Sequence, residues 1–252
     1  MRVATYNIRH AAPAGRRAHH GGMRRAVGSL GADVVALQEV DRRVVRSWFR
    51  DQAAIAGRGA GLEHRFLPAR PLGPLGRYGV ALLLPPGPHD LGNLALHSIG
   101  EPRVALFARC RVEGRWVTVV STHLQNAAGD GPADAPAQLD QLLEELSKWP
   151  TPWILMGDLN LRADKVLPRF AAAGLEAVES APTFPAHDPK VRIDWIGVRG
   201  LTNDAVEVPP LQASDHLPLV ADLSWADPPE SSHRAPNLPM GEEVRARYGP
   251  DS

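Results

Sequence analysis

Short apolar runs that end in polar residues are the feature that most constrains this chain. The clearest run is at 153–156, which is typical of a buried strand and which Gly157 is expected to end. Asp158 and Asn160 follow two residues apart, so both side chains point the same way if the backbone stays extended. A carboxylate beside a carboxamide suits a hydrolytic site, where one group orients or deprotonates water and the other binds an anionic oxygen. The alternative is an ordinary turn, since Asp, Asn and Gly are common turn residues.

Polar residues at the ends of predicted strands recur along the chain, and they are Asn7, Glu39, His123, the pair Asp158 and Asn160, and the pair Asp215 and His216. Asp194 instead lies in the middle of a strand predicted at 191–198. Such positions converge at one edge of a mixed sheet. Oxygen ligands with few histidines and no thiols suit Mg²⁺ or Mn²⁺ rather than a zinc cage. Any one of these residues alone could be an ordinary structural polar group, but the whole set predicts a metal-binding hydrolytic site.

The apolar periodicity predicts alternating strands and helices. Strands are expected at 2–8, 34–37, 64–67, 78–84, 104–112, 116–121, 153–156, 191–198, 205–208 and 217–223, and helices at 23–30, 48–56, 139–146 and 166–173. No internal linker interrupts this series, so residues 1–225 are predicted to form one domain. Residues 226–252 are rich in Pro, Glu, Ser and Arg and poor in apolar residues, which predicts a disordered or loosely packed tail.

Composition excludes several classes of protein. No run of eighteen apolar residues exists, so no transmembrane helix is expected, and no apolar segment of the signal-peptide type follows the N-terminus. Cys110 is the only cysteine and lies in an apolar alternation, which indicates a core residue and no intrachain disulfide. We therefore expect a cytoplasmic protein, and we expect it to be a monomer.

Six motifs in order carry a resemblance to a known family. They are Thr5-Tyr6-Asn7-Ile8, Ala36-Leu37-Gln38-Glu39-Val40, Ser121-Thr122-His123-Leu124, Gly157-Asp158-Leu159-Asn160, Arg192-Ile193-Asp194-Trp195-Ile196 and Ser214-Asp215-His216-Leu217-Pro218. Together they resemble the endonuclease/exonuclease/phosphatase superfamily, which has the deoxyribonuclease I-like fold. The resemblance implies an α/β (α+β) protein, a four-layer sandwich of two packed mixed β-sheets flanked by helices. It also implies a phosphoesterase that depends on a divalent metal ion.

The resemblance further implies which residues hold the metal. Glu39 would be the principal ligand of Mg²⁺ or Mn²⁺, and Asn7 would assist directly or through water. Asp215 would lie on the metal side of the site.

The remaining motif residues would act on water and phosphate. Asp158 would orient or deprotonate the attacking water, and Asn160 would hold a phosphoryl oxygen. His123 would donate a hydrogen bond to the phosphate or assist the leaving group. Asp194 would orient His216 and stabilise its charge, as a carboxylate fixes an imidazole tautomer in other hydrolases.

One position departs from the family pattern. Family members often have an Asn in a strand that contacts the site, where this chain has Val80. Pro85 and Pro86 also replace the Ser-Arg expected after that strand. The loss of an amide could alter how the substrate is held, whereas the other motif residues are all present.

The N-terminal fifth of the chain is basic although the net charge is zero. The first fifty residues hold ten arginines against three acidic residues. Arg9, Arg16 and Arg17 lie in the loop after Asn7, so they are predicted to line the mouth of the site and to bind substrate. We expect this loop to close over a phosphate-bearing group.

The substrate stays open at the level of sequence. The absence of net positive charge argues against a broad nucleic-acid surface. We therefore expect a phosphodiester or phosphomonoester of a small molecule or of a lipid-derived head group. The alternatives are an endo- or exonuclease acting on DNA or RNA, and a catalytically inactive binding protein on the same fold.

Overall fold

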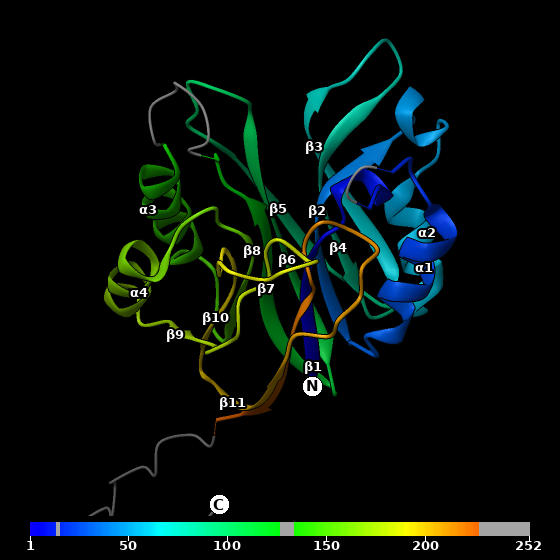
Figure 1. Ribbon diagram of the computed structural model, residues 1–252. Coiled ribbons are helices and arrows are strands. Elements are labelled where there is room, and N and C mark those ends of the chain that lie inside the picture. Colours follow the sequence, from blue (N-terminus) through cyan, green and yellow to red (C-terminus); the bar gives the residue numbers. More distant parts are fainter. Residues whose placement is uncertain (14–15, 127–133, 227–252) are drawn as a thin grey trace, which may run out of the picture.

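Two six-stranded β-sheets pack face to face in the computed structural model, with helices on both outer faces (Figure 1). The structure describes residues 1–13, 16–126 and 134–226. One sheet has the strand order β11 (Leu201–Glu207), β12 (Leu219–Trp225), β1 (Arg2–Asn7), β2 (Val34–Arg42), β4 (Arg77–Leu84) and β3 (Glu63–Pro71). The other has the order β5 (Asp90–Leu96), β6 (Arg103–Val112), β7 (Arg115–His123), β8 (Trp153–Asp158), β10 (Asp194–Arg199) and β9 (Glu176–Ala177).

The helices complete a four-layer sandwich, as the sequence predicted. The helices α1 (His20–Ser29) and α2 (Gln52–Ala60) cover the first sheet, and α3 (Ala135–Leu146) and α4 (Ala163–Ala172) cover the second (Figure 1). Two 3₁₀ turns, η1 (Arg9–Ala11) and η2 (Val45–Ser47), follow β1 and β2. Within the described residues, no helix is both long enough and apolar enough to cross a membrane.

The core has three parts because each sheet buries both of its faces. Alternate residues of β2 show how: Val34 and Ala36 pack between the sheets, whereas Val35 and Leu37 pack under α1 and α2. Cys110 is buried between the sheets, as expected of a core residue. Both sheets are mixed, since β1–β2 and β7–β8 pair in parallel and the other ladders are antiparallel.

Several element boundaries differ from the sequence predictions. The second helix begins at Gln52 rather than at residue 48, because the Asp51 side chain accepts a hydrogen bond from the backbone N–H of Ala54 and caps it. Asp194 opens β10 rather than lying in its middle. The strand β5 has no counterpart among the predictions; it is an edge strand with mostly exposed residues, so its apolar pattern is weak. The predicted tail lies outside the described residues, so it and the domain boundary stay predictions.

Gly157 lies inside β8 rather than ending it. A glycine is needed here because the backbone of the neighbouring strand β7 lies very close. A Cβ atom at this position would lie 2.3 Å from the backbone oxygen of Thr122 on β7. The two parallel strands can therefore approach only if residue 157 has no side chain. This approach places Asp158 opposite His123 in the strand register.

We expect Gly157→Ala to lower the free energy of unfolding by about 1–3 kcal/mol, because β7 and β8 must move apart. Urea denaturation measures the change. The matched control is Gly21→Ala in α1, where the nearest atom would lie 3.6 Å from the new Cβ and no loss is expected. Equal stabilities of the two variants would contradict this account.

Candidate active site

One cavity of about 740 Å³ opens where strands of the two sheets end together. It is lined by Glu39, Arg46, Arg70, Tyr78, Glu101, Arg103, His123, Gln125, Asn126, Asp158, Asn160, Arg162, Phe184, Val191, Ile193, Asp215 and His216. Six of the residues that the sequence assigned to a site are among them. Asn7 and Asp194 are fully buried beside this cavity and contact residues that line it.

Asn7 joins the two sheets at the base of the cavity. It is the last residue of β1, and its Nδ2 donates to Glu39 Oε1 at 3.1 Å and to Asp158 Oδ2 at 2.9 Å. Its Oδ1 accepts a hydrogen bond from the backbone N–H of Arg9 at 3.0 Å. Since Glu39 belongs to one sheet and Asp158 to the other, this amide fixes the two carboxylates relative to each other.

Glu39 reaches the cavity through an irregularity in β2. The strand continues to Arg42 instead of ending at Glu39, and its register with β4 shifts between Leu37 and Val40. Leu37 and Val40 both face the helices. In a regular strand, residues three apart point to opposite faces of the sheet, so the strand is irregular between them. Glu39 itself has a φ of 55°, in the left-handed region. The bulge therefore turns the Glu39 side chain away from α1 and α2 and toward Asn7.

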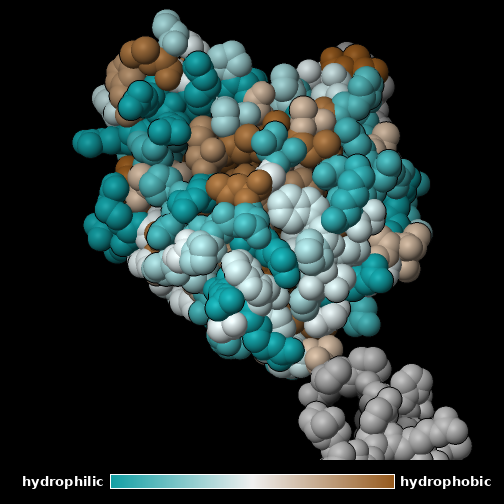
Figure 2. All heavy atoms as spheres, turned by 180° about the vertical axis from the view of Figure 1, so that it is seen from behind, coloured by the Kyte–Doolittle hydropathy of each residue, from teal (hydrophilic) through white to brown (hydrophobic). Residues whose placement is uncertain are grey.

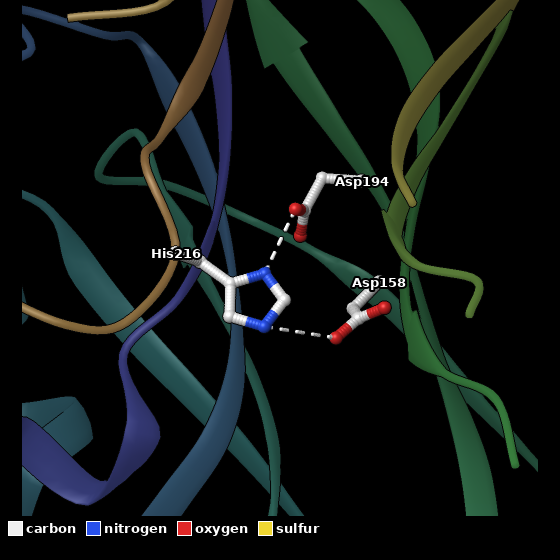
Figure 3. A group of neighbouring side chains, drawn as sticks. All are labelled: Asp158, Asp194 and His216. Atoms are coloured by element: carbon white, nitrogen blue, oxygen red, sulfur yellow. Dashed lines mark hydrogen bonds and ion pairs between the residues drawn. The ribbon is translucent and has the colours of Figure 1, made fainter. Parts of the chain in front are cut away.

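Asp194 and His216 form a buried pair beside Asp158 (Figure 3). His216 Nδ1 lies 2.9 Å from Asp194 Oδ2, which also accepts a hydrogen bond from the Thr183 hydroxyl at 2.5 Å. Burial lowers the pKa of His216, but the charge and hydrogen bond of Asp194, together with the charges of Asp158 and Asp215, outweigh burial and raise that pKa to about 10. His216 is therefore an imidazolium that donates from Nδ1, and its Nε2 lies 3.7 Å from Asp158 Oδ2.

Asp158 sits in the centre of this charged group. Burial and the nearby charge of Asp194 raise the pKa of Asp158 to about 7. Ligand atoms of Asp158, Asp194 and His216 lie within 4.8 Å of one another, a spacing that a metal ion could bridge. However, His216 is protonated and Asp194 already accepts two hydrogen bonds, so this trio is better suited to holding a proton than a metal.

His123 differs from His216 in its charge. Arg103 Nη1 lies 3.0 Å from His123 Nδ1, and because a guanidinium can only donate, Nδ1 accepts and the ring proton is on Nε2. Burial and the charges of Arg103 and His216 hold the pKa of His123 well below its usual range. His123 is thus a neutral donor whose Nε2 lies 3.6 Å from Asp158 Oδ2.

Asn160 lines the cavity, but not because the backbone is extended. Its φ is 50°, and its backbone N–H donates to Asp158 Oδ1 at 3.0 Å. Its Nδ2 donates to the Leu124 carbonyl at 3.1 Å. The chain turns here, and the turn places both side chains in one cavity, whereas their roles in hydrolysis stay a prediction.

Glu39 and Asp215 could hold a cation. Both side chains line the cavity and remain about a quarter exposed, at 25% and 22%. Burial, and in smaller part the charge of Asp215, raise the pKa of Glu39. A cation held by these two carboxylates would relieve this repulsion, and carboxylate oxygens are the hard ligands that Mg²⁺ and Mn²⁺ prefer.

The basic N-terminal loop lies outside the main cavity. Arg9 Nε forms an ion pair with Asp215 Oδ2 at 3.2 Å. Arg16 lines two smaller hollows, of about 430 and 290 Å³, and the second of these also includes Asp215. Arg17 is exposed on the surface. Residues 14–15 lie outside the described residues, and the substrate-binding role of all three arginines stays a prediction.

The structure adds a basic wall that sequence reasoning did not find. Arg46, Arg70 and Arg103 surround Tyr78, with the first two guanidinium groups 5.7 and 5.2 Å from the centre of its ring. Arg103 could have been found, because the strands predicted at 104–112 and 116–121 are close enough in the chain to pair as a hairpin. That pairing places Arg103 opposite the end of the strand that carries His123. Nothing in the sequence signals the other two. Val80 lies in the core between the sheets, two residues along β4 from Tyr78.

Comparison with known proteins identifies the family. The model of the Endonuclease/Exonuclease/phosphatase family matches residues 4–216, so the chain belongs to this family of hydrolases that act on phosphoester bonds. Two UPF0294 proteins from strains of Vibrio cholerae are 34% identical to it over 128 residues, which is 47% of this chain and 44% of each relative. The match therefore spans less than half the length of these relatives.

Solved structures show the same fold. An endonuclease/exonuclease/phosphatase from Beutenbergia cavernae has a TM-score of 0.71 and 20% identity, covering 92% of this chain and 73% of that one. The catalytic domain of human Nocturnin with a bound sulfate has a TM-score of 0.67 and 22% identity, covering 90% and 94%. A mannosyl-6-phosphatase from Bacteroides thetaiotaomicron has a TM-score of 0.69 and 15% identity, covering 89% and 100%.

The Asp194–His216 geometry predicts that the two side chains act as one unit. We expect Asp194→Asn and His216→Gln each to lower kcat by about 10²–10⁴ on an aryl phosphodiester. The double variant should lose no more than the larger single loss, because each single change already removes the oriented imidazolium. Steady-state kinetics measures this, with thermal melting to confirm folding. Losses that multiply would show that the two groups act independently.

Proposed function

We propose that this protein is a divalent-metal-dependent phosphoesterase that hydrolyses a phosphodiester or phosphomonoester by in-line attack of water. The observation that carries the proposal is the convergence of three differently charged groups on one cavity: a carboxyl group with a raised pKa at Asp158, an imidazolium at His216 and a neutral imidazole at His123. Membership of the family supports the reaction class.

The residues present fit a metal site on the Glu39 side of the cavity. Glu39 and Asp215 would be its ligands, with Asn7 nearby through its contact with Glu39. A bound Mg²⁺ or Mn²⁺ would supply charge neutralisation for the phosphoryl oxygens and the leaving group.

The protein's own residues account for the other steps. Asp158 is placed to orient the attacking water and to take up its proton, since an acceptor with a pKa near neutrality suits general base catalysis. His216, held by Asp194, presents a charged N–H to a phosphoryl oxygen. His123 can donate from Nε2, which lies 3.6 Å from Asp158 Oδ2, and its orientation is fixed by Arg103. Asn160 borders the same space and can hold a further oxygen.

The basic wall favours a substrate with a second anionic group. Arg46 is held by a bidentate pair with buried Asp41, at 2.8 and 2.9 Å, and Arg70 is held by Glu101 at 2.5 Å. Glu101 also pairs with Arg103 at 3.3 Å, so one carboxylate is shared by two guanidinium groups. The wall therefore keeps positive charge for a ligand. This supports a compact head group with two anionic groups more than a long nucleic-acid strand, which would need a broad basic surface.

The metal proposal is tested by chelation. We expect excess chelator to abolish hydrolysis and Mg²⁺ or Mn²⁺ to restore it. Glu39→Gln should lose more than about 10²-fold in activity, because it removes a ligand and not merely a supporting contact. It should also weaken Mn²⁺ binding measured by calorimetry. Glu144→Gln, at an exposed position on α3, is the matched control. Full activity in chelator would overturn the metal dependence.

The basic wall is tested with paired substrates. We expect Arg46→Gln and Arg70→Gln each to raise KM about tenfold for a phosphoester with a second anionic group, since each loses a charged hydrogen bond. The KM for a simple aryl phosphodiester should change by less than about twofold. Arg65→Gln, on β3 but paired with Glu63 outside the cavity, is the control. If plasmid DNA or RNA is cleaved far better than any small ester, with a steep salt dependence, the nuclease alternative is correct.

A further inference from the structure

Exposed hydrophobic side chains gather at one end of the molecule. Among the described residues, seven large hydrophobic side chains are exposed, and four of them belong to two turns of the first sheet. These four are Val45 (69% exposed), Trp48 (60%), Phe49 (57%) and Leu75 (69%), which we call the apolar tip. Figure 2, which shows the molecule from behind, has a group of hydrophobic residues at the upper left, where the β3–β4 turn of the first sheet lies, and a separate group at the upper right.

The two turns are in direct contact. The first is an excursion between β2 and α2, closed by a hydrogen bond from the Arg43 N–H to the Arg50 carbonyl at 3.0 Å. The second joins β3 to β4 and lies at the top of the view (Figure 1). Gly76 in this second turn packs so closely that an added Cβ would lie 3.0 Å from Val44 Cγ2. The two turns that carry the four side chains are therefore neighbours.

The backbone at the two exposed aromatic residues of the tip has an unfavourable conformation. Trp48 has a φ of 54° and Phe49 a φ of 55°, and both values lie in the left-handed region. Bulky residues adopt this region only when another interaction compensates for its steric strain. Neither side chain gains burial in return, since both remain more than half exposed. A surface that is buried only when the protein is bound would account for this arrangement.

Charge at the tip indicates what binds there. Arg43, Arg50 and Arg77 flank the tip and are exposed. In the part of the chain that the structure describes, their side chains form no ion pair with a carboxylate. Arg42 and Arg46, by contrast, are paired with Asp51 and Asp41. Apolar side chains that include Trp and Phe, surrounded by unpaired arginines, match the boundary between anionic head groups and acyl chains.

The tip also adjoins the cavity. Arg46 belongs to η2 between the tip residues, and it lines the cavity wall. Arg70 lies near the end of β3, just before the turn that carries Leu75, and it lines the same wall. A membrane under the tip would therefore lie next to the mouth of the candidate active site.

We propose that the apolar tip inserts into the surface of an anionic lipid membrane and holds the cavity mouth beside it. The binding step needs no turnover, so it can succeed or fail independently of the phosphoesterase proposal. Trp48 and Phe49 would contribute apolar burial, and Arg43, Arg50 and Arg77 would contribute attraction to anionic head groups.

Vesicle cosedimentation of the whole chain tests the proposal. We expect binding to vesicles of phosphatidylcholine and phosphatidylglycerol in equal parts, and weaker binding to phosphatidylcholine alone. The double change Trp48→Ser and Phe49→Ser should reduce binding at least about tenfold, from the lost apolar burial. The triple change Arg43→Gln, Arg50→Gln and Arg77→Gln should remove most of the preference for phosphatidylglycerol and most of the salt dependence.

The control is Leu91→Ser, which removes an exposed apolar side chain on β5, away from the tip, and should leave vesicle binding unchanged. All variants should keep the melting temperature of the unchanged protein and its activity on a soluble aryl phosphodiester. Failure of the unchanged protein to bind either vesicle would overturn the proposal, as would equal binding by the Trp48 and Phe49 variant. A dimer in light scattering that these two changes dissolve would instead assign the tip to a second copy of the chain.

Discussion

The packing of the two sheets against each other is the constraint on which the candidate site depends. Burial of apolar side chains from both sheets, such as Val3 and Ala36 against Ile154 and Met156, supplies the largest favourable contribution to folding. The same packing brings the end of β1 to the end of β8, where the Asn7 amide bonds to Asp158 across the two sheets. Neither sheet alone holds a complete set of site residues, so the site exists only in the packed sandwich.

The buried charges of the site act against folding unless they are compensated. Asp194 is fully buried, and its charge is balanced by the imidazolium of His216 and by the hydroxyl of Thr183. Asp158 accepts hydrogen bonds from Asn7 and Asn160, but burial and the nearby charge of Asp194 still raise its pKa. The low polarity that makes these groups costly also strengthens their interaction with a charged phosphoryl group. The burial of these few residues therefore lowers the stability of the fold but strengthens their interaction with the substrate.

The segments that leave the sheets determine what can approach the site. The excursion after β2 carries Arg46 and the aromatic residues Trp48 and Phe49, and the loop before β6 carries Glu101, which holds Arg70. These segments contribute little to the cores between and outside the sheets, so they can vary without loss of the fold. The six motifs thus supply the centre of the cavity, whereas the wall and the tip come from segments between these motifs.

The sequence alone determined the fold class and most of the residues at the centre of the cavity. Apolar runs and their polar ends can be recognised locally, because alternation along a strand reflects burial on each face of a sheet, and the six motifs occur in order. Only the tertiary structure decided how Glu39 turns into the cavity, since the bulge in β2 depends on its register with β4. The same holds for Arg46 and Arg70, whose positions follow from loop paths between packed strands. Register and loop path are set by the free energy of the whole packed sandwich, and a local pattern of residues does not contain that information.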